Sequence, residues 1–345
     1  MYNDRIYADG VHSVLLAEWE LLCKTPLVIR NGHQIAYGDS APIKTRYRNL
    51  QLKWREKQNQ EYEVAALHYG YEIRGNRVCS YHFVPPSSIR GALRSWSIRQ
   101  LVHPKLHSVF IPVSNEDAAS VVAHKACVQG GLSQCHEGCE LIASLFGLAA
   151  YDGEENLPSN AGRLHIETER FAGENLRPVD VSGIRMATSD GPDNVRREMP
   201  VRNPLDRMTH ASRDAGLHRF LEVASGEKFK VHLRIVNPLD CDIGLLGLWV
   251  RELNYGMLRI GALSSIGRGR MEVQKQKYGL WRRANAPRLQ EQDRFSDETD
   301  GNLPNDILSG LWKCHTISAE ALLEFTPYLR EFTGGSIDDT LSESI

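Results

Sequence analysis

The stretch from Phe229 to Ile235 constrains the fold most, because its side chains alternate strictly between two kinds. The apolar members are Phe229, Val231, Leu233 and Ile235, and the intervening residues are Lys230, His232 and Arg234. A period of two is typical of a strand with one face buried and the other in water. The sequence therefore predicts a sheet that buries one of its faces.

Helical spacing follows this strand, and a second unit of the same kind lies near the start of the chain. The later helix is predicted from Ile243, Leu246, Val250, Leu253 and Met257, with Gly256 near its end and a strand through Met271 and Val273 beyond it. The earlier strand runs within residues 12–29 to about Leu22, and residues 71–84 are expected to form a strand or hairpin interrupted at Gly75. A helix follows, with Ile89, Ala92, Leu93 and Trp96 on one face, and then a short strand at 163–169. Strand–helix–strand units at both ends predict an α+β, ferredoxin-like (RRM-like) core, one of the common platforms for RNA.

Two glycine-framed basic segments lie at the helix connections of these units. They are VPPSSIRGALR at 84–94 and IGALSSIGRGR at 260–270. Hydroxyls, backbone amides and arginines beside glycines are the chemistry that holds a phosphodiester chain. Ser87 or Ser88 is expected to cap the first helix, whose N-terminus favours an anion. The RNA contacts predicted from this chemistry are Ser87, Ser88, Arg90, Arg94, Ser264, Ser265, Arg268 and Arg270.

In this order the two segments resemble the RAMP superfamily of CRISPR RNA-guided effectors, and most closely the repeated backbone subunit of type III interference complexes, which cleaves target RNA. The first segment is similar to the family pattern Pro-Gly-Ser-Ser-Leu-Lys-Gly-Ala-Leu-Arg, with Pro86 in place of glycine and Arg90 in place of lysine. In RAMP proteins the loop that corresponds to the second segment touches guide RNA, so the resemblance implies Gly261, Gly267 and Gly269 as further RNA contacts. A third match, PLDRMT at 204–209, resembles an Ile-Asp-Arg-x-Thr element and adds Arg207 as an RNA contact. The resemblance covers roughly residues 15–275.

The resemblance implies a domain organisation and a set of partners. Residues 1–275 would form the RAMP domain, with a loop or partly helical insertion within 31–80, a zinc knuckle at 120–147 and a protruding thumb hairpin at 172–204. Residues 276–345 would be an acidic C-terminal extension. The implied partners are guide crRNA, complementary target RNA, and other CRISPR effector subunits or copies of this chain.

A zinc site is predicted by His124, Cys127, Cys135 and Cys139, which are spaced H-x2-C-x7-C-x3-C. Four soft ligands within sixteen residues can close a tetrahedral, structural Zn²⁺ site. His136 could replace one of these ligands, so the exact ligand set stays open. Relatives carry such a knuckle before a Leu-Phe-Gly element, and Leu145, Phe146 and Gly147 stand in that position here.

The candidate for catalysis is Asp39. The sequence GDSAPIK at 38–44 resembles the context of the cleaving aspartate in the backbone subunit. Asp39 would bind Mg²⁺ or Mn²⁺ or position the RNA 2′-hydroxyl, and Lys44 and Arg46 would hold the phosphate. Two alternatives stay open: an RNA-binding subunit in which Asp39 makes an ordinary turn, and a subunit that processes guide precursor through histidine. The histidines available for the latter are His33, His68 and His82.

The charge distribution is compatible with RNA binding, although the net charge is only −2. Residues 291–345 hold 12 acidic and 3 basic residues, a net charge of −9, so the first 290 residues carry +7. The sequence has no apolar run near the ~20 residues of a membrane span, and its start lacks the features of a signal peptide. These observations predict a cytoplasmic protein without a membrane partner.

Overall fold

The structure is a computed structural model that describes the main body of the chain and parts of its projections. The described residues are 10–37, 62–75, 77–101, 137–147, 161–172, 177–180, 185–186, 197–198, 201–202, 218–219, 222–290, 292–297 and 312–333. Among them, no helix is both long and apolar enough to cross a membrane.

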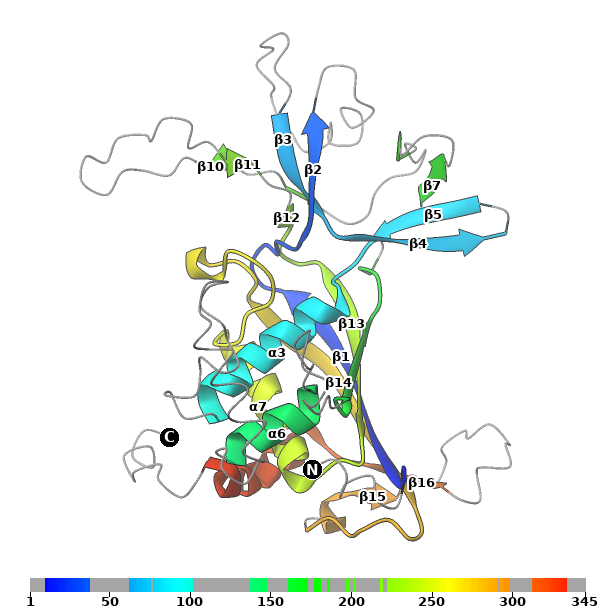
Figure 1. Ribbon diagram of the computed structural model, residues 1–345, viewed down its shortest axis with the longest axis vertical. Coiled ribbons are helices and arrows are strands. Elements are labelled where there is room, and N and C mark those ends of the chain that lie inside the picture. Colours follow the sequence, from blue (N-terminus) through cyan, green and yellow to red (C-terminus); the bar gives the residue numbers. More distant parts are fainter. Residues whose placement is uncertain are drawn as a thin grey trace, which may run out of the picture.

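A six-stranded antiparallel sheet forms the centre of the molecule, in the order β15-β16-β14-β1-β13-β6 (Figure 1). Its strands are β1 (Ser13–Cys23), β6 (Leu164–Thr168), β13 (Lys228–Val236), β14 (Met271–Arg283), β15 (Ser296–Asp297) and β16 (Trp312–Thr316). The four strands β14-β1-β13-β6, joined in chain order with helices after β1 and β13, have the ferredoxin-like arrangement. The mixed fold of helices and antiparallel sheets predicted from the sequence is confirmed.

Helices cover one face of this sheet. They are α3 (Pro86–Leu101), α6 (Glu137–Phe146), α7 (Asp240–Tyr255), α8 (Ala319–Leu322) and the 3₁₀ segment η5 (Leu323–Thr333); short 3₁₀ turns are η3 (Ser264–Ile266) and η4 (Gln292–Arg294). The strands bury alternate side chains under the helices, as Leu15, Trp19 and Leu21 show in β1. The Trp19 indole donates to the Tyr278 hydroxyl at 3.0 Å, so its polar atom is satisfied within the core.

Smaller strand pairs project from the upper end of the body (Figure 1). One is β2 (Arg30–Tyr37) with β3 (Tyr62–Leu67), and another is β4 (Tyr69–Arg74) with β5 (Arg77–His82), extended by β7 (Arg177–Asp180) and β8 (Arg185–Met186). The remaining pairs are β10 (Val201–Arg202) with β11 (His218–Arg219), and β12 (Glu222–Val223) with β9 (Arg197–Glu198). The expected hairpin at 71–84 is confirmed, with its turn at Gly75.

The described elements cross several of the expected boundaries. The segment 31–80, expected as a loop or partly helical insertion, contains strands β2 to β5 in its described part. Residue 275, expected to end the first domain, falls inside β14, and β16, α8 and η5 join the same body, where Leu322, Phe325 and Leu329 are buried. Met257 lies beyond α7 and is 76% exposed, because Gly256 ends that helix in a left-handed conformation.

A buried ion pair links β6, β13, α6 and α7. The Arg163 guanidinium donates to both carboxylate oxygens of Asp242, at 2.6 and 3.0 Å, and both side chains are fully buried. Arg163 also donates to the Ser144 hydroxyl of α6 and to the carbonyl of Asn237 after β13. Asp242 in turn accepts from the Leu239 amide at the start of α7. The pair therefore fixes the entry to β6, the end of β13, α6 and α7 in one arrangement.

Candidate nucleic-acid interface

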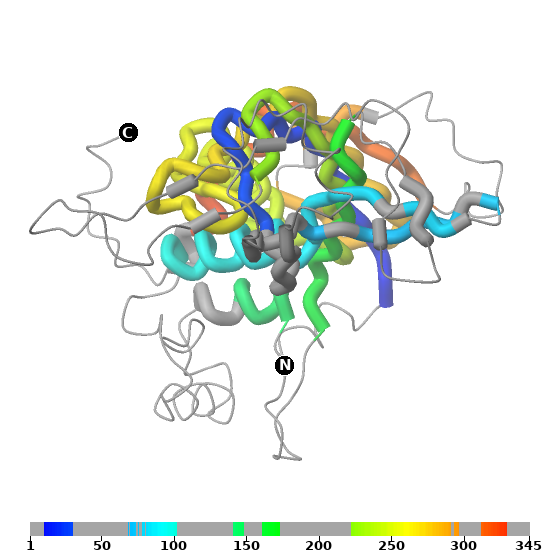
Figure 2. The backbone as a smooth tube through the Cα atoms, turned by 90° about the horizontal axis from the view of Figure 1, so that it is seen from above, coloured from blue at the N-terminus to red at the C-terminus, as the bar shows by residue number. Residues whose placement is uncertain are grey.

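A groove of about 690 Å³ lies between α3 and the loop that follows α7. Both views place α3 beside this loop, coloured cyan and yellow (Figures 1 and 2). One wall of the groove is a single face of α3, because residues three or four apart lie next to one another on a helix. It is lined by Ser88, Ala92, Ser95, Trp96 and Arg99 of α3. The fold thus brings parts of the two glycine-framed segments, 84–94 and 260–270, to a single groove.

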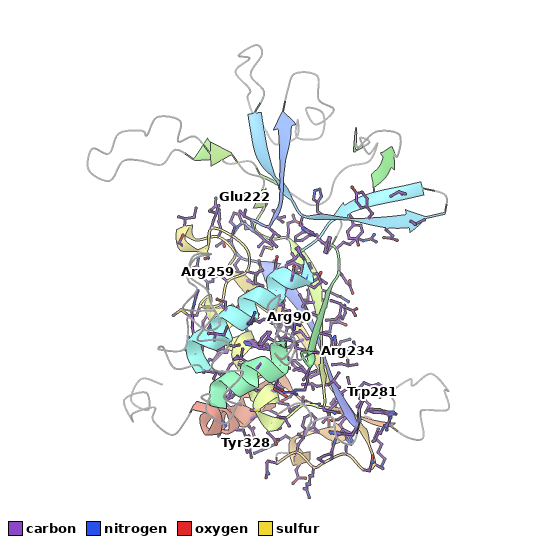
Figure 3. All side chains as sticks on the ribbon, viewed as in Figure 1. Arg90, Glu222, Arg234, Arg259, Trp281 and Tyr328 are labelled. Atoms are coloured by element: carbon purple, nitrogen blue, oxygen red, sulfur yellow. The ribbon has the colours of Figure 1, made fainter. Side chains whose placement is uncertain are left out.

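The other wall is formed by the turn after α7 and the glycine-rich loop. Its lining residues are Met257, Leu258, Arg259, Gly261, Ala262, Ser264 and Ser265, and Val28 and Ile29 from the segment after β1 complete the groove. Figure 3 shows Arg259 beside this loop. Its guanidinium donates to the carbonyls of Gly256 at 3.1 Å and Ser264 at 3.2 Å. These two contacts hold the side chain in place and leave other N–H groups of its five for a ligand.

The loop is held against the segment after β1 by backbone hydrogen bonds. The Ala262 amide donates to the Val28 carbonyl at 2.8 Å, and the Gly269 amide donates to the Pro26 carbonyl at 3.0 Å. Gly261 has φ +87°, and a Cβ there would lie 2.5 Å from the Val28 carbonyl oxygen. The close approach therefore requires glycine at this position.

The groove presents several hydrogen-bond donors to an anion, and its described lining contains no carboxylate. Its described lining contains four serines and two arginines, but neither aspartate nor glutamate. Within the described part of the chain, the Arg99 guanidinium and the hydroxyls of Ser264 and Ser265 make no hydrogen bond or ion pair. Uncommitted donors without a competing acid are suited to phosphate oxygens.

Arg90 and Arg94, two of the predicted RNA contacts, do not line this groove. Arg90 donates to the carbonyls of Leu164 and Phe146, and its guanidinium lies 5.8 Å from the centroid of the Phe146 ring. Figure 3 shows it between α3 and α6. Burial lowers the pKa of Arg90, and burial with the nearby Arg90 charge lowers the pKa of Arg94. Arg90 therefore joins α3 to α6 and β6.

The arginines of the second segment, Arg268 and Arg270, do not line the groove either. Arg268 forms a two-pronged ion pair with Glu222, at 2.9 and 3.0 Å, in which the Glu222 side chain is only 2% exposed. Arg268 therefore anchors the loop rather than lining the groove. Arg270 is exposed, and its side chain lies along Gly256. Ser87 is exposed in the first turn of α3, which begins at Pro86, so neither Ser87 nor Ser88 is its cap.

Gly267 and Gly269, also predicted as RNA contacts, belong to the glycine-rich loop but do not line the groove. The other predicted site residues fall outside the described residues. They are Asp39, Lys44, Arg46, Arg207, His124, Cys127 and Cys135, with the alternative zinc ligand His136. Of Cys139, the structure describes the backbone position, which is in α6. Of the thumb segment 172–204, it describes β7, β8, β9 and β10. The catalytic, zinc and thumb assignments stay predictions.

Two of the histidines considered for acid–base chemistry are brought together. His68 and His82 line a cavity of about 10 Å³, together with Phe83, Phe171 and other apolar side chains. His82 is 6% exposed, and burial lowers the pKa of His68. This cavity has room for about one water molecule and none for a nucleotide.

Sequence reasoning does not single out Ser95, Arg99 and Arg259 as groove residues. The spacing of Ser88, Ala92, Ser95 and Arg99 is a usable signal, because it marks a small and polar stripe on one helical face. Arg259 immediately precedes the second segment, but only the fold turns it toward the groove.

Comparison with known proteins gives one family match. A family model described as the RAMP superfamily matches residues 20–272. Among solved structures, a chain described as "Type IV-B CRISPR Complex" has a TM-score of 0.40 and 12% identity, and the alignment covers 84% of this chain and 95% of that one. No curated protein matches the sequence.

Proposed function

This chain belongs to the RAMP superfamily, and we propose that it binds guide RNA as a subunit of a CRISPR effector complex. The observation that carries the proposal is the groove between α3 and the glycine-rich loop, which has four serines and two arginines and lacks a described carboxylate. Arg99 and Arg259 would neutralise phosphates from opposite walls. The serine hydroxyls would bond phosphate or sugar oxygens. These contacts do not read bases, so specificity would come from pairing between guide and target.

Replacing both groove arginines tests this proposal. In the double variant Arg99→Ala/Arg259→Ala, we expect binding of single-stranded RNA to weaken about tenfold or more, because charge-assisted phosphate contacts are lost. The plot of log K against log salt has a negative slope, and its magnitude should decrease by about 1.4, since each of the two lost single-strand phosphate contacts contributes about 0.7. Fluorescence anisotropy over a salt series measures both quantities.

A double variant of equal charge change provides the control. Lys313 and Arg288 are exposed cations away from the groove, and Arg288 pairs at the surface with Asp293. Lys313→Ala/Arg288→Ala should keep nearly the original affinity and slope. Equal losses in the two double variants would mean that RNA responds to overall charge and not to this groove.

The same proposal includes the assembly in which the subunit would act. Other CRISPR subunits or copies of this chain would lie along one guide, and the segment 172–204 would act as a thumb against the guide–target duplex. Support for this part comes from the sequence resemblance and the family membership.

Metal-dependent cleavage of target RNA is the further part that the resemblance supports, with Asp39 as the essential residue. In a complex assembled with guide and complementary RNA, Asp39→Ala should abolish Mg²⁺- or Mn²⁺-dependent cleavage and leave RNA binding within about twofold. Gel analysis of labelled target measures the cleavage. Undiminished cleavage would favour the alternative in which this chain is a structural RNA-binding subunit.

A structural Zn²⁺ is proposed at His124, Cys127, Cys135 and Cys139. Elemental analysis of protein purified without chelator should give about one zinc per chain, because a closed four-ligand site holds its metal through purification. The variant Cys135→Ser should reduce that content, whereas Cys314→Ser should not. Protein that retains no zinc before any substitution would contradict the site.

A further inference from the structure

A second groove, of about 680 Å³, lies on the face of the sheet turned away from the helices. Its floor contains the cross-strand row Thr316, Gly279, Leu16, Arg234 and His165, which runs over five neighbouring strands from β16 to β6. Trp281 stands at one end of the groove, and Figure 3 shows it and Arg234 along the same side of the sheet. The α3 groove lies elsewhere, on the helical side of the molecule.

Gly279 keeps the middle of this floor open. It lies inside β14 without a positive φ, and the register shift of β14 against β1 occurs elsewhere, between Glu20 and Leu21. A Cβ at Gly279 would meet nothing nearer than the Cys314 sulfur at 3.6 Å and the Trp281 Nε1 at 3.9 Å. Neither the backbone nor the packing therefore requires glycine. A glycine within a strand often marks a place where a ligand approaches closely.

Trp281 and Arg234 supply two different kinds of contact to this open floor. The Trp281 indole nitrogen lies beside the space above Gly279, and Leu16, 40% exposed, continues the apolar floor. Arg234 is two strands from Gly279, a separation of about 10 Å. Within the described residues, neither the indole N–H nor the Arg234 guanidinium has a hydrogen bond or ion pair. A ligand with a flat ring at one end and an anion at the other fits this arrangement.

The acidic groups of the groove leave the anion position open. Glu18 forms an ion pair with Lys230 at 3.1 Å, and Lys277 lies opposite Glu18 on the neighbouring strand β14. Glu167 lies on β6 in the next cross-strand row, beside His232. Its carboxylate can accept a hydrogen bond from a ribose hydroxyl or a base amino group.

We propose that this outer groove binds a nucleotide, with its base above Gly279 against Trp281 and its phosphate on Arg234. The ring, the anion and the hydroxyl groups of one nucleotide match the apolar end, the arginine and the acceptor of the groove. The site is separate from the guide-RNA groove and does not depend on it. The same chemistry can come from a free nucleotide or from an unpaired nucleotide of an RNA strand.

Calorimetric titration of the full chain with AMP tests the site directly. Gly279→Val should weaken AMP binding at least about tenfold by filling the floor, while a β-branched residue suits the strand and should preserve the melting temperature. Arg234→Gln should weaken AMP about tenfold and adenosine less than about twofold, because only AMP carries the phosphate. Lys275→Gln, an exposed cation of the same sheet face outside the groove, should change neither.

A short single-stranded RNA, titrated into the Arg99→Ala/Arg259→Ala protein, distinguishes the two sources. If AMP and RNA both bind and Gly279→Val abolishes both, the site accepts free nucleotides as well as strands. If only RNA binds and Gly279→Val abolishes that binding, the site accepts strands alone. The proposal is overturned if neither probe binds at millimolar concentration, or if both bind equally well to Gly279→Val. In the overturning case, loss of complex assembly in Gly279→Val would assign this face to a protein subunit.

Discussion

Replacing Asp242 by alanine is expected to reduce the free energy of unfolding by about 3–5 kcal/mol, a large fraction of the ~5–15 kcal/mol that stabilises a typical folded protein. The loss is large because Arg163 would remain fully buried without its carboxylate. The same change removes the contact that Asp242 makes with the Leu239 amide at the start of α7. Chemical denaturation followed by circular dichroism measures the loss.

The surface pair of Arg288 and Asp293 gives a matched control. It has the same chemical groups at 3.1 Å, but its side chains are 71% and 89% exposed. Asp293→Ala should change stability by no more than about 1 kcal/mol. If Asp242→Ala were equally mild, the buried pair would not hold the elements together as described.

Gly269→Ala is expected to reduce the free energy of unfolding by about 2–5 kcal/mol and to weaken RNA binding. The residue has φ +75°, which alone costs about 1–2 kcal/mol for alanine, and overpacking adds about 1–3 kcal/mol. The overpacking arises because the new Cβ would fall against the Ile260 carbonyl oxygen, next to the hydrogen bond from the Ile260 amide to the Gly269 carbonyl. Relief of that overlap would move the loop that carries Ser264 and Ser265.

Gly267→Ala separates backbone strain from overlap. Gly267 has φ +88°, but a Cβ there would meet no atom within 4 Å. Its substitution should cost only about 1–2 kcal/mol and leave the groove in place. Thermal melting and RNA anisotropy, measured on both variants, should separate them; indistinguishable results would contradict the close approach at Gly269.

The parts of the fold that follow a local pattern can be predicted from the sequence. Alternation identifies β13, and helical spacing identifies α7, because one buried face imposes its period on the side chains. Strand β2 is not predicted, because its partner β3 lies beyond a polar stretch, and pairing over such a distance leaves no local period. The burial of Leu322, Phe325 and Leu329 is not predicted, because the C-terminal segment that contains them is rich in acidic residues, although their spacing is helical.

The candidate site can be located from the sequence, but the arginines that line it cannot. Serines and glycines next to basic residues identify the two walls, and Ser88, Gly261, Ser264 and Ser265 do line the groove. Whether an arginine faces a ligand depends on tertiary partners. Arg268 meets Glu222, 46 residues earlier in the chain, and Arg90 meets carbonyls of α6 and β6. No local pattern encodes such partners.

Photochemical crosslinking tests the central claim most directly. Single-stranded RNA containing one 4-thiouridine, irradiated with the full chain and analysed by mass spectrometry, should crosslink to peptides from both α3 and the segment 257–265. Crosslinks from one nucleotide position to both segments are the result expected of a strand lying between Arg99 and Arg259. Crosslinks that avoid both segments, under conditions where RNA is bound, would contradict the account.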